Sequence, residues 1–181
     1  MKRRLTRRTE EMIERSIAYF PELNGRIITV GYTRVHLGSA AMSRKPDREP
    51  RLVIRLRVRD LTYQTIGHEL THLVQGLSLD GRGPTAYERI PSGETQCDIW
   101  TLARHKLFCD DTPTYIKMPR MMRELWPNYS QAVRQLCVAA IDKRRYIRSY
   151  IRWLESEIAA LAQTSRQKNS APAQLSFTFI D

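Results

Sequence analysis

The chain has 181 residues, of which 41% are hydrophobic, enough for one domain with a core of its own. Lysine and arginine number 30 against 19 acidic residues, so the net charge of +11 favours nucleic acid, an anionic membrane or an acidic protein as partner but specifies no reaction. The three cysteines cannot all pair with one another and none lies in a C-x-x-C, which argues against a disulfide framework or a four-cysteine zinc site and for a reducing compartment.

No segment of the sequence is typical of secretion or membrane insertion. The first 20 residues start basic but carry charges throughout, where a signal peptide needs about 7 to 15 apolar residues in succession. No stretch approaches the roughly 20 apolar residues of a membrane span. We therefore expect a cytoplasmic protein that does not enter a membrane.

The chain is expected to begin with a helix. Thr9 is the expected N-cap, Glu10 and Glu11 follow in the first turn, and Pro21 is expected to end the helix. The apolar face of this helix is predicted to consist of Ile13, Ile17 and Phe20.

A small twisted sheet is predicted after this helix. β-Branched and aromatic residues favour strands over 26–35 and 51–59, with a short strand over 35–43 that contains GSAAMS. In the strand over 51–59 apolar and basic residues alternate, so we expect one buried and one basic face. The basic face is predicted to consist of Arg51, Arg55, Arg57 and Arg59. We expect these arginines to contact nucleic-acid phosphates, with solubility alone as the alternative role.

Helices are predicted for most of the remaining chain. Asp60 or Thr62 is expected to cap a helix whose apolar residues keep helical spacing as far as Gly76. A second amphipathic helix is predicted over about 92–108, and a short helix is predicted to open at Pro119.

The last folded element is predicted to be one long helix over 130–163 with an apolar stripe along it. Its segment KRRYIRSYIRW (143–153) mixes basic with aromatic residues, which also favours nucleic-acid contact. The sequence therefore predicts a single α+β domain over residues 1–163. Residues 164–181 are expected to form a flexible tail with an apolar end, LSFTFID.

The sequence His68-Glu69-Leu70-Thr71-His72 lies inside one of these predicted helices. Residues four apart share a helix face, about 5 to 6 Å apart at Cβ, so both imidazoles can bind one metal ion. Glu69 is rotated by about 100° around the helix, so its carboxylate can reach a water molecule beside that ion without being a ligand. With only 4 histidines, composition alone produces this pattern in roughly half a percent of such chains, so chance is a poor explanation.

A catalytic zinc site needs a third protein ligand and an open position. The metzincin pattern H-E-x-x-H-x-x-G-x-x-H is absent from the sequence. The candidate is Glu94, 22 residues after His72, and Asp98 four residues later can accept the free N–H of a ligating histidine. His105, on the same predicted stripe, is the alternative ligand. Cys97 is interpreted as a small buried residue whose side chain projects off the face that Glu94 and Asp98 share.

Residues 63–105 resemble the gluzincins, zinc metallopeptidases that combine H-E-x-x-H with E-x-x-x-D on a following helix. The resemblance implies a zincin-like fold, in which an active-site helix and a helix bearing the glutamate ligand follow the sheet. The ligands that it implies for Zn²⁺ are His68, His72 and Glu94. It further implies Glu69 as general base and acid, and Asp98 as the partner of a ligating histidine.

The order of helix, strands and active-site helix resembles that of small intracellular members, the minigluzincins and the SprT-like proteases that act on DNA-bound proteins. SprT-like proteins usually have a histidine as third ligand, whereas no histidine lies between His72 and His105 here. ImmA/IrrE-like proteases, which cut repressors, also pair H-E-x-x-H with a later glutamate. The resemblance therefore leaves the subfamily open.

The sequence thus predicts a zinc-dependent endopeptidase, a hydrolase acting on DNA-associated proteins, with a protein or peptide substrate and DNA as partners. The substrate is expected along the exposed edge of the GSAAMS strand. Candidates to donate a hydrogen bond to the oxyanion are Tyr87, Tyr115 and Tyr129. The alternatives are an ImmA/IrrE-like protease of a soluble regulator, and a non-catalytic basic nucleic-acid-binding protein that retains a metal site.

Overall fold

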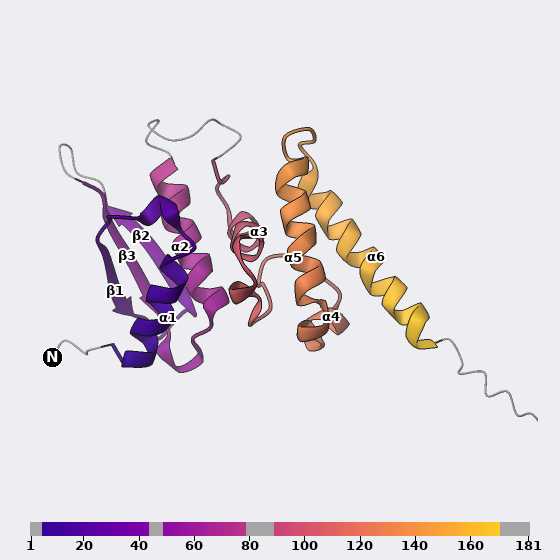
Figure 1. Cartoon of the computed structure of the whole chain (residues 1–181), viewed down its shortest axis with the longest axis horizontal. Coiled ribbons are helices and arrows are strands. Elements are labelled where there is room, and N and C mark those ends of the chain that lie inside the picture. The colour runs from indigo at the N-terminus through magenta and orange to yellow at the C-terminus, as the bar shows by residue number, and fades with distance from the viewer. Residues whose placement is uncertain (1–4, 44–48, 79–88, 171–181) are drawn as a thin grey trace, which may run out of the picture.

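The computed structural model describes residues 5–43, 49–78 and 89–170. In these residues the chain has an α+β fold, with an N-terminal helix, a three-stranded mixed sheet and five further helices (Figure 1). The helices are α1 (Arg7–Ile17), α2 (Tyr63–Ser78), α3 (Glu94–Arg104), α4 (Arg120–Glu124), α5 (Trp126–Lys143) and α6 (Tyr150–Ser170). The strands are β1 (Ile28–Tyr32), β2 (Gly38–Ser43) and β3 (Arg51–Leu56), and short 3₁₀ turns span Pro21–Leu23, Val58–Asp60 and Lys106–Cys109. The predicted α+β class is confirmed, whereas the zincin-like fold stays a prediction.

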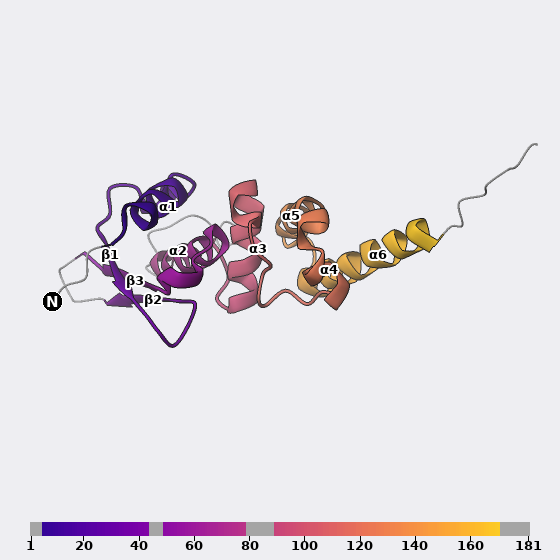
Figure 2. The same cartoon turned by 90° about the horizontal axis from the view of Figure 1, so that it is seen from below.

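The sheet places β3 in the centre, with β1 parallel and β2 antiparallel to it. Leu52, Ile54 and Leu56 of β3 are fully buried in a core shared with α1 and α2, which lie on the same face of the sheet (Figure 2). β2 is therefore an edge strand, and no strand in the described residues pairs with its outer edge.

The four arginines predicted to form one strand face do not do so. Arg51 and Arg55 are exposed on the sheet face opposite the core, but β3 ends at Leu56. Arg57 and Arg59 fall at a 3₁₀ turn that leads the chain from the sheet into α2. The Arg57 Nε atom lies 3.3 Å from a carboxylate oxygen of Asp60. The alternation of apolar and basic residues continues past Leu56 in the sequence, but the backbone leaves the sheet there.

Helix α1 begins earlier than predicted. The Thr6 Oγ1 atom accepts a hydrogen bond from the Thr9 backbone N–H at 3.2 Å, so Thr6 and not Thr9 is the N-cap. Two threonines three residues apart each satisfy the capping rule, and the structure uses the first. Pro21 lies beyond the helix end, as predicted, and opens a 3₁₀ turn.

Two side chains cap helix α2. Thr62, one of the two predicted caps, accepts from the Thr65 backbone N–H at 3.1 Å, and Asp110 accepts from the N–H groups of Tyr63 and Gln64 at 2.7 and 2.9 Å. The helix does not stop at Gly76 but continues to Ser78. Gly76 allows a close contact instead, since a Cβ there would lie 2.7 Å from the Met42 Cε of β2.

The predicted long helix over 130–163 is two helices, α5 and α6, which pack against each other. One continuous helix of that length would span about 50 Å and leave its apolar stripe without a partner. Folding back at residues 144–149 buries Val133 and Cys137 of α5 together with Leu154 and Ile158 of α6. Helix α6 also extends to Ser170, into the predicted tail, and LSFTFID lies outside the described residues. Among the helices of the described ranges, none is both long and apolar enough to cross a bilayer.

Candidate metal centre

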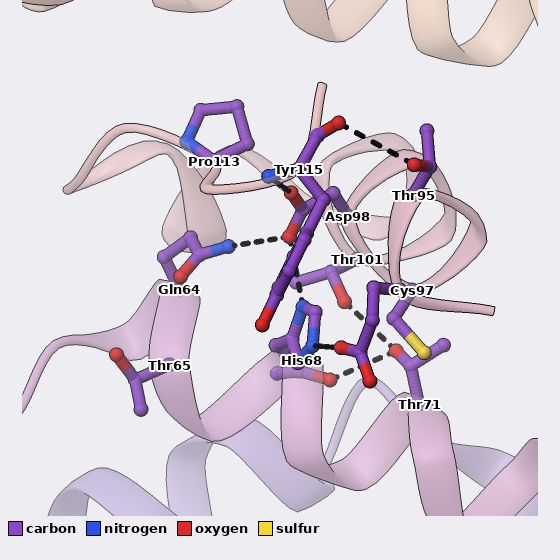
Figure 3. Close-up of polar contacts among 12 residues, drawn as sticks. Gln64, Thr65, His68, Thr71, Thr95, Cys97, Asp98, Thr101, Pro113 and Tyr115 are labelled. Atoms are coloured by element: carbon purple, nitrogen blue, oxygen red, sulfur yellow. Dashed lines mark hydrogen bonds and ion pairs between the residues drawn. The ribbon is translucent and has the colours of Figure 1, made fainter. Parts of the chain in front are cut away.

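Close packing of α2 on α3 brings the sequence motifs together. A Cβ at Gly67 would lie 2.6 Å from Thr101 Cγ2 and 2.7 Å from Phe108 Cδ1, so only glycine permits this approach. The hydroxyl groups of Thr71 and Thr101 are 2.8 Å apart in the same interface (Figure 3). The two helices therefore face each other at the level of His68, one residue after the glycine.

The side chains of His68, His72 and Glu94 converge at one point. The Nε2 atoms of His68 and His72 lie 2.9 and 3.1 Å from the same Glu94 carboxylate oxygen, Oε2. The two imidazole rings are in edge contact with their centroids 4.9 Å apart. The three ligands predicted from the sequence are thus within reach of one another.

Asp98 fixes the orientation of His68. Its carboxylate is completely buried and accepts hydrogen bonds from His68 Nδ1 at 2.8 Å, Gln64 Nε2 at 3.0 Å and the Tyr115 backbone N–H at 2.6 Å (Figure 3). A carboxylate can only accept, so Nδ1 carries the proton and Nε2 of a neutral His68 presents its lone pair toward Glu94. Asp98 is thus the hydrogen-bond partner of His68, and its role beside a ligating histidine stays a prediction.

Gln75 fixes the orientation of His72, a role that no motif in the sequence indicates. The buried amide lies one turn after His72, with Oε1 3.0 Å from His72 Nδ1. Its Nε2 donates to the backbone carbonyls of Pro91 and Gly93 at 2.5 and 3.3 Å. Since these carbonyls occupy the amide nitrogen, the oxygen faces His72 and accepts from Nδ1–H. Nε2 of a neutral His72 then also presents a lone pair toward Glu94.

Cys97 is a second neighbour of His72. The thiol is buried, its Sγ lies 3.3 Å from His72 Nδ1, and ligand atoms of His68, His72 and Cys97 all fall within 4.8 Å of one another. This group could bind a metal ion. However, the thiol approaches the ring nitrogen that Gln75 already uses, whereas Glu94 faces the other nitrogen. Burial, together with the nearby carboxylates, Glu94 first among them, raises the pKa of Cys97 far above its ordinary value.

Burial and the neighbouring charged groups shift the pKa values of His68 and Glu94 in opposite directions. Burial lowers the pKa of His68, but the hydrogen bond and charge of Asp98, with smaller contributions from Glu94 and Glu69, raise it above 6.5 on balance. Burial raises the pKa of Glu94, yet hydrogen bonds from both histidines bring it below its ordinary value. Both shifts favour a protonated His68 beside an ionised Glu94.

Glu69 lies beside this centre and is buried, with its Oε2 atom unpaired among the described residues. Burial raises the pKa of Glu69 to about 7, with the Glu94 charge also raising it and His68 lowering it. Gly38 of β2 makes room for this side chain, because a Cβ there would lie 2.5 Å from Glu69 Oε1. Glu69 is therefore held between α2 and the edge strand β2.

A cleft of about 570 Å³ opens over these side chains. One wall is β2 from Gly38 to Met42, the floor is α2, and Thr114 and Tyr115 form the opposite side. The half-exposed Tyr115 ring stacks on His68 with centroids 5.5 Å apart (Figure 3). Of the three tyrosines considered as oxyanion donors, Tyr115 lines the cleft, Tyr129 is buried in the core, and Tyr87 lies outside the described residues.

His105, the alternative ligand, has another role. Its Nδ1 accepts from the Leu107 backbone N–H at 3.1 Å and caps a 3₁₀ turn, while its ring stacks on Tyr19 with centroids 4.1 Å apart. It does not join the cluster of His68, His72 and Glu94.

Two of the basic surfaces expected from the sequence carry exposed side chains in the described residues. One is the outer face of the sheet, with Arg51 and Arg55. The other is the α5–α6 turn, where Arg145 and Arg148 are exposed and Tyr146 is 84% exposed. Of the other aromatic residues in this segment, Tyr150 is buried and the Lys143 ammonium lies over the Trp153 ring, so Tyr146 is the most exposed of the three.

Comparison with known proteins gives no relative: no family model, no curated protein sequence and no solved structure matches this chain.

Proposed function

We propose that this chain is a zinc-dependent endopeptidase of the gluzincin type. The observation that carries the proposal is the meeting of His68, His72 and Glu94 at one point of a cleft, next to a buried carboxylate, Glu69, with one unpaired oxygen. The arrangement of sheet, active-site helix and glutamate-bearing helix also has the order expected of a zincin-like fold.

The residues present fit a zinc ion. In their neutral forms both histidines carry the proton on Nδ1, where Asp98 and Gln75 accept it, and direct the Nε2 lone pair toward Glu94 Oε2. The two nitrogens and the carboxylate oxygen all donate electron pairs, so a cation or additional protons must lie between them. Ligand atoms about 2.0 to 2.1 Å from a tetrahedral zinc lie about 3.3 Å from each other. The separations of 2.9 and 3.1 Å between the histidine nitrogens and Glu94 are already close to this value.

The chemistry assigned to the chain is hydrolysis of a peptide bond. When bound, Zn²⁺ supplies a Lewis acid that polarises the substrate carbonyl and acidifies water. Glu69, with its pKa raised to about 7 in the metal-free protein, takes the proton from the attacking water and then returns it to the leaving amine. The Tyr115 hydroxyl is the donor that we assign to the developing oxyanion, because the Tyr115 ring lines the cleft and stacks on His68.

The substrate is proposed to bind as an extended strand along β2. This edge strand lines the cleft over Gly38–Met42 and has an outer edge with no partner among the described strands. Small side chains at Ser39, Ala40 and Ala41 let a peptide backbone approach closely. The Glu69 carboxylate packs against Gly38, so the bond to be cut would lie near the start of β2.

DNA-associated proteins are the proposed substrates, since the net charge of +11 and the two basic surfaces favour a polyanionic partner. Minigluzincins and SprT-like proteases remain the families proposed, with an ImmA/IrrE-like protease and a non-catalytic metal-binding protein as alternatives. To test the function, purified zinc-loaded protein is incubated with an unfolded protein substrate, with and without single-stranded and duplex DNA. We expect substrate cleavage or self-cleavage that a chelator abolishes; no cleavage in any mixture favours the non-catalytic alternative.

Replacement of Asp98 by Asn should weaken zinc binding by about 10- to 100-fold, because the partner that orients His68 is disturbed. An amide keeps one acceptor oxygen, but its NH₂ group would face the Tyr115 N–H or the Gln64 amide, which are also donors. Competition with a chromophoric chelator measures the affinity. Asp110→Asn is the matched control, since Asp110 accepts two backbone N–H groups at α2 without touching a histidine. Equal losses in both variants would contradict a specific role for Asp98.

Charge reversal at Arg51 and Arg55 should flatten the salt dependence of single-stranded DNA binding without changing zinc content. Each phosphate contact contributes about −0.7 to the log–log slope, so two lost contacts reduce its magnitude by about 1.4. Fluorescence anisotropy over a salt series measures the slope. The control variant reverses Arg7 and Arg120, which are exposed and pair within their own helices, and so makes the same change in net charge. No affinity of the native protein at low salt would favour a protease of soluble regulators.

A further inference from the structure

We infer that Gln75 decides which nitrogen of His72 faces the metal ion, and thereby makes Glu94 rather than Cys97 the third ligand. The inference rests on the proposed metal centre and concerns a positioning residue within it. His72 has a candidate ligand on each side: Glu94 Oε2 at 3.1 Å from Nε2, and Cys97 Sγ at 3.3 Å from Nδ1. A neutral imidazole has only one lone pair, so the position of its single proton selects between them.

The position of that proton is set by contacts outside the centre. Gln75 could present either its oxygen or its NH₂ group to His72, but the backbone carbonyls of Pro91 and Gly93 both need a donor. The NH₂ group therefore points to these carbonyls, and the oxygen to His72 Nδ1. Because Nδ1 must then carry the proton, its side of the ring is closed to an ion and the lone pair on Nε2 faces Glu94.

The same amide holds the segment that carries Glu94. Gly93, with a positive φ of 118°, is the N-cap of α3, and Glu94 is the first residue of that helix. Gln75 thus joins one ligand on α2 to the backbone just before another ligand on α3. Asp98 joins His68 to the Tyr115 backbone in the same way. Each histidine therefore has one buried partner that also binds the backbone at, or next to, a residue that lines the cleft.

Without the Gln75 acceptor, we expect the His72 proton to move from Nδ1 to Nε2. In a Gln75→Met variant Nδ1–H has no oxygen to bond, whereas a proton on Nε2 can be donated to Glu94 Oε2. The lone pair then lies on Nδ1, facing Cys97. A metal ion bound there would take the thiolate as ligand, and the thiol proton would be released to solvent.

The test uses Co²⁺ alone, because a thiolate ligand gives cobalt an intense near-ultraviolet charge-transfer band that imidazole and carboxylate ligands lack. We expect no such band in the native protein. In Gln75→Met we expect the band, together with an affinity for Co²⁺ about 10- to 100-fold lower. Adding Cys97→Ser to Gln75→Met should remove the band. A thiolate band in the native protein, or its absence from Gln75→Met, would overturn the inference.

A second variant keeps the test decisive if Gln75→Met does not fold. Glutamate at this position still accepts from Nδ1–H but cannot donate to Pro91 or Gly93. Gln75→Glu should therefore bind Co²⁺ without a thiolate band, and a band in this variant would also refute the assignment. A native protein that takes up neither Co²⁺ nor Zn²⁺ would instead overturn the proposed function, so the two failures are distinguishable.

Discussion

Replacing Glu69 by Gln is expected to reduce the turnover of a peptide substrate by about 10²- to 10⁴-fold while zinc affinity stays near that of the native protein. The amide occupies nearly the same volume but cannot take a proton from water at neutral pH. The three residues that converge at the centre, His68, His72 and Glu94, remain unchanged. The loss should therefore appear in kcat rather than in metal content.

The matched control is Glu124→Gln, the same substitution at an exposed glutamate that pairs with Arg120. This variant should retain native turnover. Metal analysis and single-turnover kinetics on both variants separate loss of chemistry from loss of zinc. If Glu69→Gln kept chelator-sensitive turnover, Glu69 would not be the general base.

The metal-free Glu69→Gln variant should also show that inactivity is not unfolding. Burial raises the pKa of Glu69 from 4.5 to about 7, so the folded protein holds this proton more tightly than the unfolded chain does. The stabilisation is complete below pH 4.5 and is lost as pH rises to about 7, by about 3 kcal/mol in total. Relative to the variant, the free energy of unfolding of the native protein should fall over this range. Parallel curves for the two proteins would contradict the burial of this carboxylate.

The convergence of His68 and His72 could be predicted from the sequence because it depends on helical periodicity alone. Any helix through these residues places them on one face, whatever it packs against. The position of Asp98 relative to Glu94 follows from the same rule on α3. The distance between α2 and α3 depends on Gly67, which leaves room for Thr101. A glycine within a predicted helix does not indicate which other helix packs against it.

Gln75 and Cys97 show where sequence reasoning stopped. Gln75 lies three residues after His72, which is a local signal, but the orientation of its amide depends on the carbonyls of Pro91 and Gly93. The helical geometry predicts that Cys97 projects off the face shared by Glu94 and Asp98, but its Sγ lies 3.3 Å from His72 Nδ1, beside the same two histidines. The roles of Gln75 and Cys97 depend on contacts between different elements, whereas helical periodicity predicts only which residues of one helix are neighbours.

The errors in the fold have a similar origin. Nothing in the local pattern of residues 143–150 marks a helix end as Pro or Gly would, so the break between α5 and α6 became visible only through the packing of the two helices. The alternation of arginines continues past Leu56, although the chain must turn there to enter α2 at Tyr63. In both cases a local pattern extends beyond the element that it describes.

Removal of the Glu94 side chain is expected to weaken zinc binding by more than about 100-fold, a larger effect than disturbing a partner outside the ligand set. Alanine at position 94 leaves two imidazoles and removes the carboxylate whose Oε2 faces both Nε2 atoms. Zinc content after dialysis and competition with a chelator measure the effect. Glu94 is about half exposed at the start of α3, so the substitution should change the free energy of unfolding little.

Cys97→Ala is the comparison that decides between the two candidate third ligands. The thiol is completely buried and lies 3.3 Å from His72 Nδ1, so it is about as close to the His72 ring as the Glu94 carboxylate is. Because Gln75 engages the nitrogen that faces this thiol, we expect Cys97→Ala to retain zinc affinity within about threefold while Glu94→Ala loses it. The reverse pattern would make Cys97 the ligand and Glu94 a neighbouring acid. A zinc site of two histidines and a cysteine with Glu69 beside it would still leave a position open for water, so peptide hydrolysis would then have to be tested on that ligand set.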